Sequence, residues 1–261
     1  MSAPAPDGPA VAGDEPRNLD DYVVQYGRLP FEPLQAAVRR RRVLQQVRSI
    51  APRRLLEIGC GLDPLFTDLP DVQEIVVLEP AAAFASAARA AASGCRGVTV
   101  VEARAEDVAP ADLGAPFDAV VLSSLLHEVP DPSALLLAVR RFCGRSTVVH
   151  VNVPNARSLH RLLAVAMGLV EDVYALSPVQ RQMQQRGTYD LDGLRAELAA
   201  AGFVVARWGT VLVKPFPHAQ MQELVDSGFL TPRLIDGLDS LAEALPEIGS
   251  ELWVDAEVAD V

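Results

Sequence analysis

Two acidic residues and two glycines form the most informative group in the sequence. The run LEIGCG at positions 56–61 ends an apolar stretch, and Glu79 follows 18 positions after Gly61. Glycines at a strand tip, here Gly59 and Gly61, let the backbone pass close to a ligand. A carboxylate in the position of Glu79 can accept hydrogen bonds from both hydroxyls of a ribose. Glu57 can accept from a ligand ammonium or from a neighbouring loop, and the two alternatives stay open at this point.

This glycine pair departs from the fingerprint of a dinucleotide site. A GxGxxG motif needs a third glycine, because a pyrophosphate sits on the following helix N-terminus. Pro64 occupies the third position here. The sequence therefore disfavours an NAD-linked oxidoreductase, which remains the rival enzyme class.

The elements that must position these residues alternate along the chain. Five short apolar runs have the length and the Val, Ile and Leu content of buried strands. They are Leu55–Ile58, Ile75–Leu78, Val98–Val101, Ala119–Leu122 and Val148–Val153. Helical stretches at Ala81–Ala92 and Pro132–Phe142 lie between them. The alternation predicts a doubly wound, mostly parallel α/β sheet whose ligands bind at the carboxyl ends of the strands.

The later sequence completes this sheet to seven strands. A helix at Leu191–Ala201 precedes a strand at Phe203–Val213, and Glu251–Val258 alternates as a last strand. We expect a disordered tail at 1–18, an N-terminal helical cap at 19–52 and a domain at 53–261. That domain would carry helical insertions at about 154–185 and 217–245.

The cap contains an unusual run of four arginines. Apolar positions recur at helical spacing over Leu34–Ile50, and Arg39–Arg42 interrupts them. The run indicates a solvated helix face, or a face from which one arginine turns inward to meet a carboxylate.

Composition excludes several function classes. Half of the 261 residues are hydrophobic, and the formal net charge is −11, which leaves no basic field for nucleic acid or an anionic membrane. No apolar run reaches the roughly 18 residues of a membrane span. The three cysteines are far apart with no CxxC, which argues against disulfides or structural zinc and is typical of cytoplasmic proteins.

The motifs together resemble the class I S-adenosylmethionine-dependent methyltransferases, near their small-molecule group. The resemblance is carried by LLEIGCG, the strand ending at Glu79, ARAEDV, FDAVVLSSLLHEVPDP and VVHVNVPN, in this order over about residues 53–155. It implies the Rossmann-like methyltransferase fold, S-adenosylmethionine as cofactor and a small-molecule acceptor. Methyl transfer would go to oxygen or nitrogen, in natural-product biosynthesis.

The resemblance also implies roles for single residues. Gly59 and Gly61 would approach the amino-acid part of the cofactor, and Glu79 would bind its ribose. The backbone at Ala105 and Glu106 would meet the adenine edge, and Ser123 would line the methionine moiety. Many relatives have an aspartate where this chain has Arg104. In those relatives the aspartate accepts a hydrogen bond from the adenine amino group. In this chain that contact passes to Glu106 or Asp107 or is absent, and either acid could instead cap the next segment.

Side chains near the acceptor would complete the site. His127 would act as a base or orient the acceptor, with a structural hydrogen bond to Glu128 as the alternative. Asn155 and His160 follow the fifth strand, in a segment that often covers the acceptor in this family. The weaker candidates are His218 in the late insertion and Tyr22 and Tyr26 as closing aromatics, while His150 is expected to be a core residue. Arg157, Arg161, Arg186 and Lys214 are candidates for an anionic group on the acceptor, with surface solvation as the alternative.

Partners and activity leave further alternatives. We expect a small-molecule substrate, no metal, no nucleic acid and no membrane, with a homodimer as a possible assembly. SSLL stands after the fourth strand, where a nucleic-acid methyltransferase would carry an Asn/Asp-Pro-Pro-aromatic motif. A non-catalytic cofactor-binding partner on the same fold remains the alternative to an enzyme.

Overall fold

A computed structural model of the chain describes residues 29–177, 180–181 and 184–259. The predicted tail at 1–18, the first part of the predicted cap, and Tyr22 and Tyr26 lie outside these residues. Within the described part, no helix has the length and apolar character needed to cross a bilayer.

Seven strands form one sheet in the order β3-β2-β1-β4-β5-β7-β6. They are β1 Arg54–Ile58, β2 Glu74–Leu78, β3 Val98–Val101, β4 Phe117–Ser123, β5 Cys143–Pro154, β6 Phe203–Val211 and β7 Glu251–Val258. The first five pair in parallel, whereas β7 is antiparallel to both β5 and β6. The predicted mostly parallel, seven-stranded sheet is confirmed.

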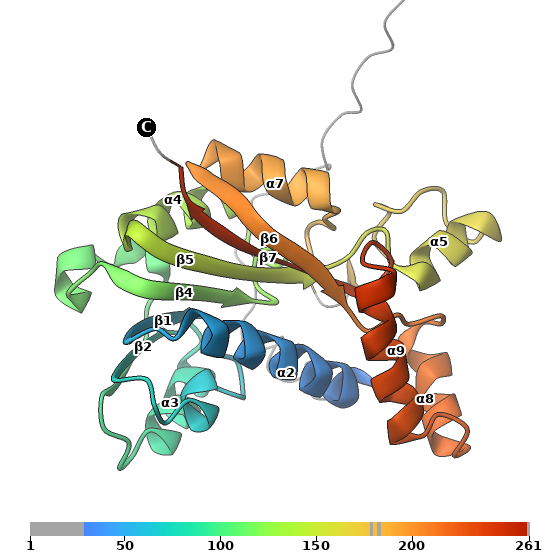
Figure 1. The fold of residues 1–261 in the computed structure, drawn as a ribbon, viewed down its shortest axis with the longest axis horizontal. Coiled ribbons are helices and arrows are strands. Elements are labelled where there is room, and N and C mark those ends of the chain that lie inside the picture. The colour runs from blue at the N-terminus through green and yellow to red at the C-terminus, as the bar shows by residue number, and fades with distance from the viewer. Residues whose placement is uncertain (1–28, 178–179, 182–183, 260–261) are drawn as a thin grey trace, which may run out of the picture.

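Helices cover both faces and the carboxyl end of the sheet (Figure 1). They are α2 Glu32–Ile50, α3 Ala82–Ala91, α4 Pro132–Arg141, α5 Leu159–Ala166, α7 Leu191–Ala200, α8 His218–Asp226 and α9 Pro232–Ala244. In Figure 1, α4 and α7 lie above the sheet, α2 and α3 lie below it, and α5, α8 and α9 gather at the right, beyond the arrow tips of β4 and β5.

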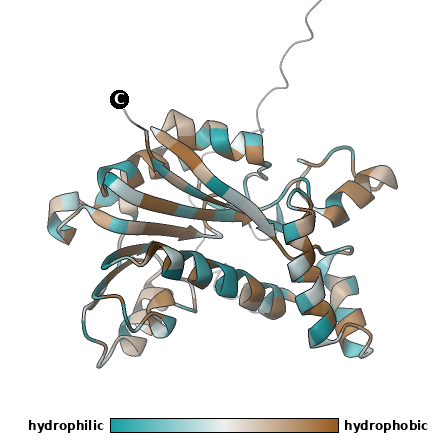
Figure 2. Cartoon of the chain, in the orientation of Figure 1, coloured by the Kyte–Doolittle hydropathy of each residue, from teal (hydrophilic) through white to brown (hydrophobic). Residues whose placement is uncertain are grey.

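Two apolar layers hold these helices on the sheet. One packs α4 and α7, through residues such as Leu136 and Leu198, against β4, β5 and β7. The other packs the carboxyl half of α2, through Val43 and Val47, against β1 and β2. Figure 2 shows hydrophobic residues concentrated in the strands, while α2 also carries hydrophilic residues along much of its length. The amino-terminal half of α2 must therefore be held partly by polar contacts.

A third apolar cluster joins the amino-terminal half of α2 to the late insertion. Phe31 and Val38 pack with Leu212, Met221 and Ile235. The two helices predicted for 217–245 are confirmed as α8 and α9, with Pro232 in the first turn of α9. The insertion thus closes over the carboxyl end of β6 and the amino end of β7.

The prediction that 154–185 is mostly helical was wrong. Among its described residues, α5 ends at Ala166, Gly168 adopts a φ of +70°, and turns and irregular chain follow as far as 177. The Arg161 guanidinium donates to the carbonyls of Val173 at 2.8 Å and Ala175 at 2.7 Å. These bonds stabilise the irregular path, which apolar spacing alone does not reveal.

Candidate functional site

A cavity of about 490 Å³ opens at the carboxyl ends of β1, β2 and β4, beside the amino-terminal half of α2. All seven residues predicted to bind the cofactor line it: Glu57, Gly59, Gly61, Glu79, Ala105, Glu106 and Ser123. The predicted acceptor and base residues His127, Asn155 and His160 are not among the described residues of its wall. The residues predicted to bind the cofactor therefore converge on one cavity, whereas the residues predicted to contact the acceptor do not line it.

The glycine loop after β1 has the backbone geometry that its sequence predicts. Gly59 and Gly61 adopt φ values of +75° and +55°, a region that side chains disfavour. The Gly59 amide donates to the carbonyl of Leu78 at 2.8 Å, which fixes the loop against β2. A Cβ atom on Gly61 would meet nothing within 4 Å. At Gly61 the backbone therefore leaves room for another molecule.

Glu79 connects the end of β2 to this loop. Its Oε2 accepts from the Gly61 amide at 3.1 Å, and its Oε1 accepts from the Ala81 amide at 2.9 Å. Burial raises the pKa of the carboxyl group, and the backbone donors oppose that rise. Each carboxylate oxygen has a second lone pair, so the group can still accept from a ligand hydroxyl.

Glu57 makes a contact to its own loop, one of the two alternatives left open by the sequence. The Leu65 amide donates to both of its carboxylate oxygens, at 3.2 and 3.0 Å. Burial raises the pKa of Glu57 to about 8. The Glu57 side chain therefore buttresses the glycine loop and carries a proton readily near neutral pH.

Arg40 of α2 holds the loop from the other side. Its Nη2 donates to the Pro64 carbonyl at 2.9 Å and to the Thr67 hydroxyl at 2.8 Å, and the guanidinium pairs with Asp68 at 2.8 Å. Pro64, which replaces the third glycine of a dinucleotide motif, therefore sits in a loop clamped by a helix that precedes β1.

The loop after β3 forms a short 3₁₀ turn at Ala105–Asp107. Arg141 of α4 donates to the carbonyls of Ala105 at 3.3 Å and Glu106 at 3.1 Å. Arg104 also lines the cavity, and its side chain is exposed. These bonds hold the backbone of the turn in place. A site that recognises the edge of a ligand through main-chain groups needs such a fixed backbone.

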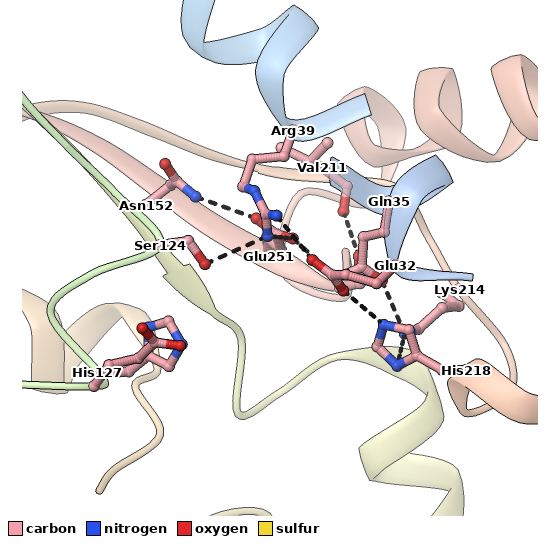
Figure 3. Close-up of polar contacts among 12 residues, drawn as sticks. Glu32, Gln35, Arg39, Ser124, His127, Asn152, Val211, Lys214, His218 and Glu251 are labelled. Carbon is pink, nitrogen blue, oxygen red and sulfur yellow. Dashed lines mark hydrogen bonds and ion pairs between the residues drawn. The ribbon is translucent and has the colours of Figure 1, made fainter. Parts of the chain in front are cut away.

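Arg39 turns inward, the second of the two alternatives for the arginine run (Figure 3). Its Nη1 lies 2.8 Å from Glu251 Oε1 and donates to the Ser124 hydroxyl at 3.3 Å. Its Nη2 lies 2.9 Å from Glu32 Oε1. Arg39, Glu32 and Ser124 all line the cavity. A buried guanidinium between two carboxylates thus forms the wall opposite the glycine loop.

The cluster continues through Gln35 to Lys214. Gln35 donates to Glu251 and accepts from the Lys214 ammonium, each at 2.9 Å. The surface alternative for Lys214 was wrong, because this side chain is buried. Burial lowers the pKa of Lys214 to about 8, and the charges of Glu32 and Glu251 oppose the change.

His218, the first residue of α8, closes the cluster. Its Nε2 lies 3.2 Å from Glu32 Oε2, and its Nδ1 lies 3.3 Å from the Lys214 ammonium (Figure 3). Burial disfavours ionisation of Glu32, but hydrogen bonds from His218 and Arg39 hold its pKa at about 2. Glu32 is therefore a carboxylate at neutral pH.

His127 lies apart from this cluster (Figure 3). Its side chain is buried, its Nε2 is 3.6 Å from Glu128 Oε1, and its carbonyl accepts from the Arg186 amide at 2.9 Å. This geometry matches the structural alternative, and the role of base stays a prediction. Glu128, unlike His127, lines the cavity.

Asn155 has a structural explanation in the fold. Its amide nitrogen donates to the carbonyls of Glu247 at 2.8 Å and Gly249 at 2.9 Å, while its oxygen accepts from the Arg157 amide. Both amide hydrogens are thus used to hold the connection into β7. His150 is a paired core residue, with its Nδ1 2.7 Å from Asp255 Oδ1.

Sequence reasoning missed Glu251, Glu32 and Ser124. Glu251 opens a strand whose residues are buried on both faces, so alternation gives no sign of its orientation. Ser124 follows β4 with a φ of +56°. The arginine run did indicate that such an acidic residue exists. If one of its arginines turns inward, the buried guanidinium requires a carboxylate from elsewhere in the chain.

Comparisons with known proteins agree with this geometry. A sequence model of a methyltransferase domain family matches residues 32–207. A search of curated protein sequences gave no significant match.

Several solved structures share the fold at low sequence identity. The 1,6-didemethyltoxoflavin-N1-methyltransferase of Burkholderia thailandensis has a TM-score of 0.61 and 14% identity, covering 97% of this chain and 94% of that one. An S-adenosylmethionine-dependent methyltransferase from Mesorhizobium loti has a TM-score of 0.55 and 16% identity, covering 82% and 96%. The [4+2]-cyclase SpnF has a TM-score of 0.56 and 18% identity, covering 90% and 84%.

Proposed function

This chain belongs to the methyltransferase domain family, and we propose that it methylates an oxygen or nitrogen of a small-molecule metabolite. Its cofactor is S-adenosylmethionine, which supplies an electrophilic methyl group when bound. One observation carries the proposal: the Gly59–Gly61 backbone and the Glu79 carboxylate meet at the wall of one cavity of about 490 Å³.

The residues of this cavity fit the cofactor. The open space at Gly61 admits a group close to the backbone, and Glu79 offers lone pairs for ribose hydroxyls. Two acidic residues of the cofactor wall, Glu79 and Glu106, suit a ligand that carries positive charge. The main chain at Ala105 and Glu106 would receive the adenine edge.

The chain's contribution to methyl transfer would be alignment. Holding two reactants in an in-line geometry removes much of the entropy cost of bringing them together during the reaction. The loop clamped by Arg40 and Glu57 would fix one reactant, and the wall of Arg39, Glu32 and Ser124 would face the other. His127 remains our proposed base, acting after a change in its loop, and the cavity-lining Glu128 is the neighbouring carboxylate.

A metabolite acceptor is supported by charge and by cavity size. The net charge of −11 disfavours nucleic acid, and the cavity has the volume of a small-ligand site. The Burkholderia neighbour is a methyltransferase with bound 1,6-didemethyltoxoflavin and S-adenosylhomocysteine. We extend this to a role in natural-product biosynthesis, in a cytoplasmic protein.

Calorimetry with S-adenosylmethionine and S-adenosylhomocysteine tests the first half of the proposal. We expect saturable binding of both, lost when Gly61 is replaced by a bulky residue. Transfer of a labelled methyl group to a panel of hydroxylated and amino metabolites tests the second half. Absence of cofactor binding by the folded wild-type chain would overturn the assignment.

A second candidate function is a cofactor-binding protein that catalyses no methyl transfer. The [4+2]-cyclase SpnF shares the fold over 90% of this chain. The burial of His127 outside the cavity wall is compatible with this alternative. Tight cofactor binding without methyl transfer to any acceptor of the panel would favour it.

A further inference from the structure

The first turn of α5 contains two buried polar atoms whose partners are missing from the described residues. They are the hydroxyl oxygen of Ser158, a residue with no exposed surface, and the Nδ1 atom of His160. Buried polar groups are normally hydrogen-bonded, and an exception needs a water, an ion or a ligand to explain it. Two such atoms in one turn indicate a place built to hold something.

The position of Ser158 sharpens this indication. It is the N-cap residue of α5, yet its hydroxyl makes no capping hydrogen bond to the helix. The N-terminus of a helix carries a partial positive charge and favours an anion. The hydroxyl that would usually cap this turn is therefore still available as a donor.

Three basic side chains act electrostatically on the same turn. The imidazole of His160 feels the charges of Lys214, Arg161 and His218, which together with burial hold its pKa well below the usual range. A neutral imidazole can donate from one ring nitrogen while remaining uncharged. The turn therefore combines neutral donors with a positive surrounding potential.

Lys214 has capacity left for a ligand. Among the described residues its hydrogen bonds go to Gln35 Oε1 at 2.9 Å and His218 Nδ1 at 3.3 Å, which leaves one of three ammonium hydrogens. Glu32 and Glu251 act on it through space, but Gln35 and His218 stand between Lys214 and those carboxylates. Glu32 in turn lines the cofactor cavity.

We propose that Ser158, His160 and Lys214 form an anion subsite that holds a carboxylate or phosphate group of the methyl acceptor. The subsite rests on the proposed function, since the anionic group that it holds would belong to the methyl acceptor. It narrows the substrate class to anionic metabolites, with the methylated oxygen or nitrogen remote from the anionic group.

Nuclear magnetic resonance of the histidine rings tests the subsite without a known substrate. The chain has four histidines, so a His160→Gln variant identifies the His160 signals. Sodium acetate and sodium phosphate serve as probes, with sodium chloride at matched ionic strength as the blank. We expect a saturable shift of the His160 signals with acetate, phosphate or both, and the more effective probe names the anionic group.

Variants separate the subsite from general charge effects. Ser158→Ala removes only a hydroxyl without a described partner, so the fold should survive, and Lys214→Met removes the ammonium. Each substitution should weaken binding of the saturating probe about tenfold, as expected for loss of a hydrogen bond to a charged group. Arg233→Gln, which removes an exposed cation of α9, should leave probe affinity unchanged.

The outcomes are decisive. A saturable shift that Ser158→Ala weakens supports the subsite. No saturable shift with either probe overturns it, and so does equal weakening by Arg233→Gln. Calorimetry of cofactor binding on the same samples distinguishes failure of the subsite from failure of the proposed function, because Ser158 and Lys214 lie outside the described cavity wall.

Discussion

The Arg39 guanidinium lies 2.8 Å from the Glu251 carboxylate, and 212 positions separate the two residues in the chain. The contact fastens α2 to β7 beside the cofactor cavity. Both side chains are almost completely buried, so the pair is shielded from water.

Breaking this pair should destabilise the protein strongly. Arg39→Met leaves the buried Glu251 carboxylate without its guanidinium, which should lower the free energy of unfolding by about 3–5 kcal/mol. Urea unfolding measures the change. Arg41→Met, which removes an exposed pair with Asp236, should cost less than about 1 kcal/mol. Equal effects of the two substitutions would contradict the burial argument.

Glu79→Ala should reduce affinity for S-adenosylmethionine. It removes a carboxyl acceptor of ribose hydroxyls, worth about 1.5–3 kcal/mol, or roughly ten- to hundredfold in the dissociation constant. Calorimetry gives the change. Glu102→Ala, which removes an exposed carboxylate paired with Arg89, is the matched control and should have no effect. Unchanged binding by Glu79→Ala would remove Glu79 from the site.

Gly61→Ala should impair cofactor binding more than folding. Its φ of +55° imposes a backbone cost of about 1 kcal/mol on alanine, and the new methyl group would point into space that the cofactor needs. Gly228→Ala, at a φ of +75° with nothing within 4 Å of its Cβ, carries the same kind of strain away from the cavity. If both variants bind cofactor equally well, the glycine loop does not contact it.

Glu57 should make stability fall as pH rises. Its pKa of about 8 in the folded state exceeds the ordinary value of 4.5, so the folded state binds the proton more tightly. The stabilisation is complete below about pH 4.5 and is lost as pH rises towards 8, by an amount on the order of a few kcal/mol. Urea unfolding of the wild type and Glu57→Gln across this range isolates the contribution. Parallel profiles would show that Glu57 does not titrate there.

His127→Ala distinguishes a base from a structural residue. We expect turnover to depend on His127 as the proposed base; if His127 is only structural, loss of its buried contact with Glu128 should lower the free energy of unfolding by about 1–3 kcal/mol. Loss of a general base would instead lower kcat by about 10²–10⁴ with little change in stability. Thermal unfolding and methyl transfer by the same preparation separate the two, once an acceptor is found. His160→Gln provides the comparison for kcat.

The sheet was predictable because each buried strand is a short run of Val, Ile and Leu between polar turns. The largest boundary difference is at β5, which begins at Cys143 and not at Val148. The Thr147 hydroxyl accepts from the Gly144 amide and donates to the Phe117 carbonyl, which extends the pairing through residues without an apolar pattern. Such a side-chain contact to a neighbouring strand cannot be inferred from local composition.

The cofactor side of the site was predictable for a related reason. Its residues lie in short motifs at strand ends, and the topology of a parallel sheet brings those ends together. The polar cluster beside the cofactor cavity depends on pairs such as Arg39–Glu251 and Lys214–Gln35, whose members come from distant elements. The backbone turn at Ser124 also breaks the alternation that would orient His127.

The place of β7 in the sheet affects the order in which a growing chain can assemble. β7 lies between β5 and β6, so neither can acquire its final neighbour until residues 251–258 have been synthesised. Arg39 emerges early beside Glu32 but must wait through 212 positions of synthesis for its second carboxylate, Glu251. A ribosome paused before residue 251 would hold a nascent chain with β6 unpaired and with Arg39 lacking its contact to β7.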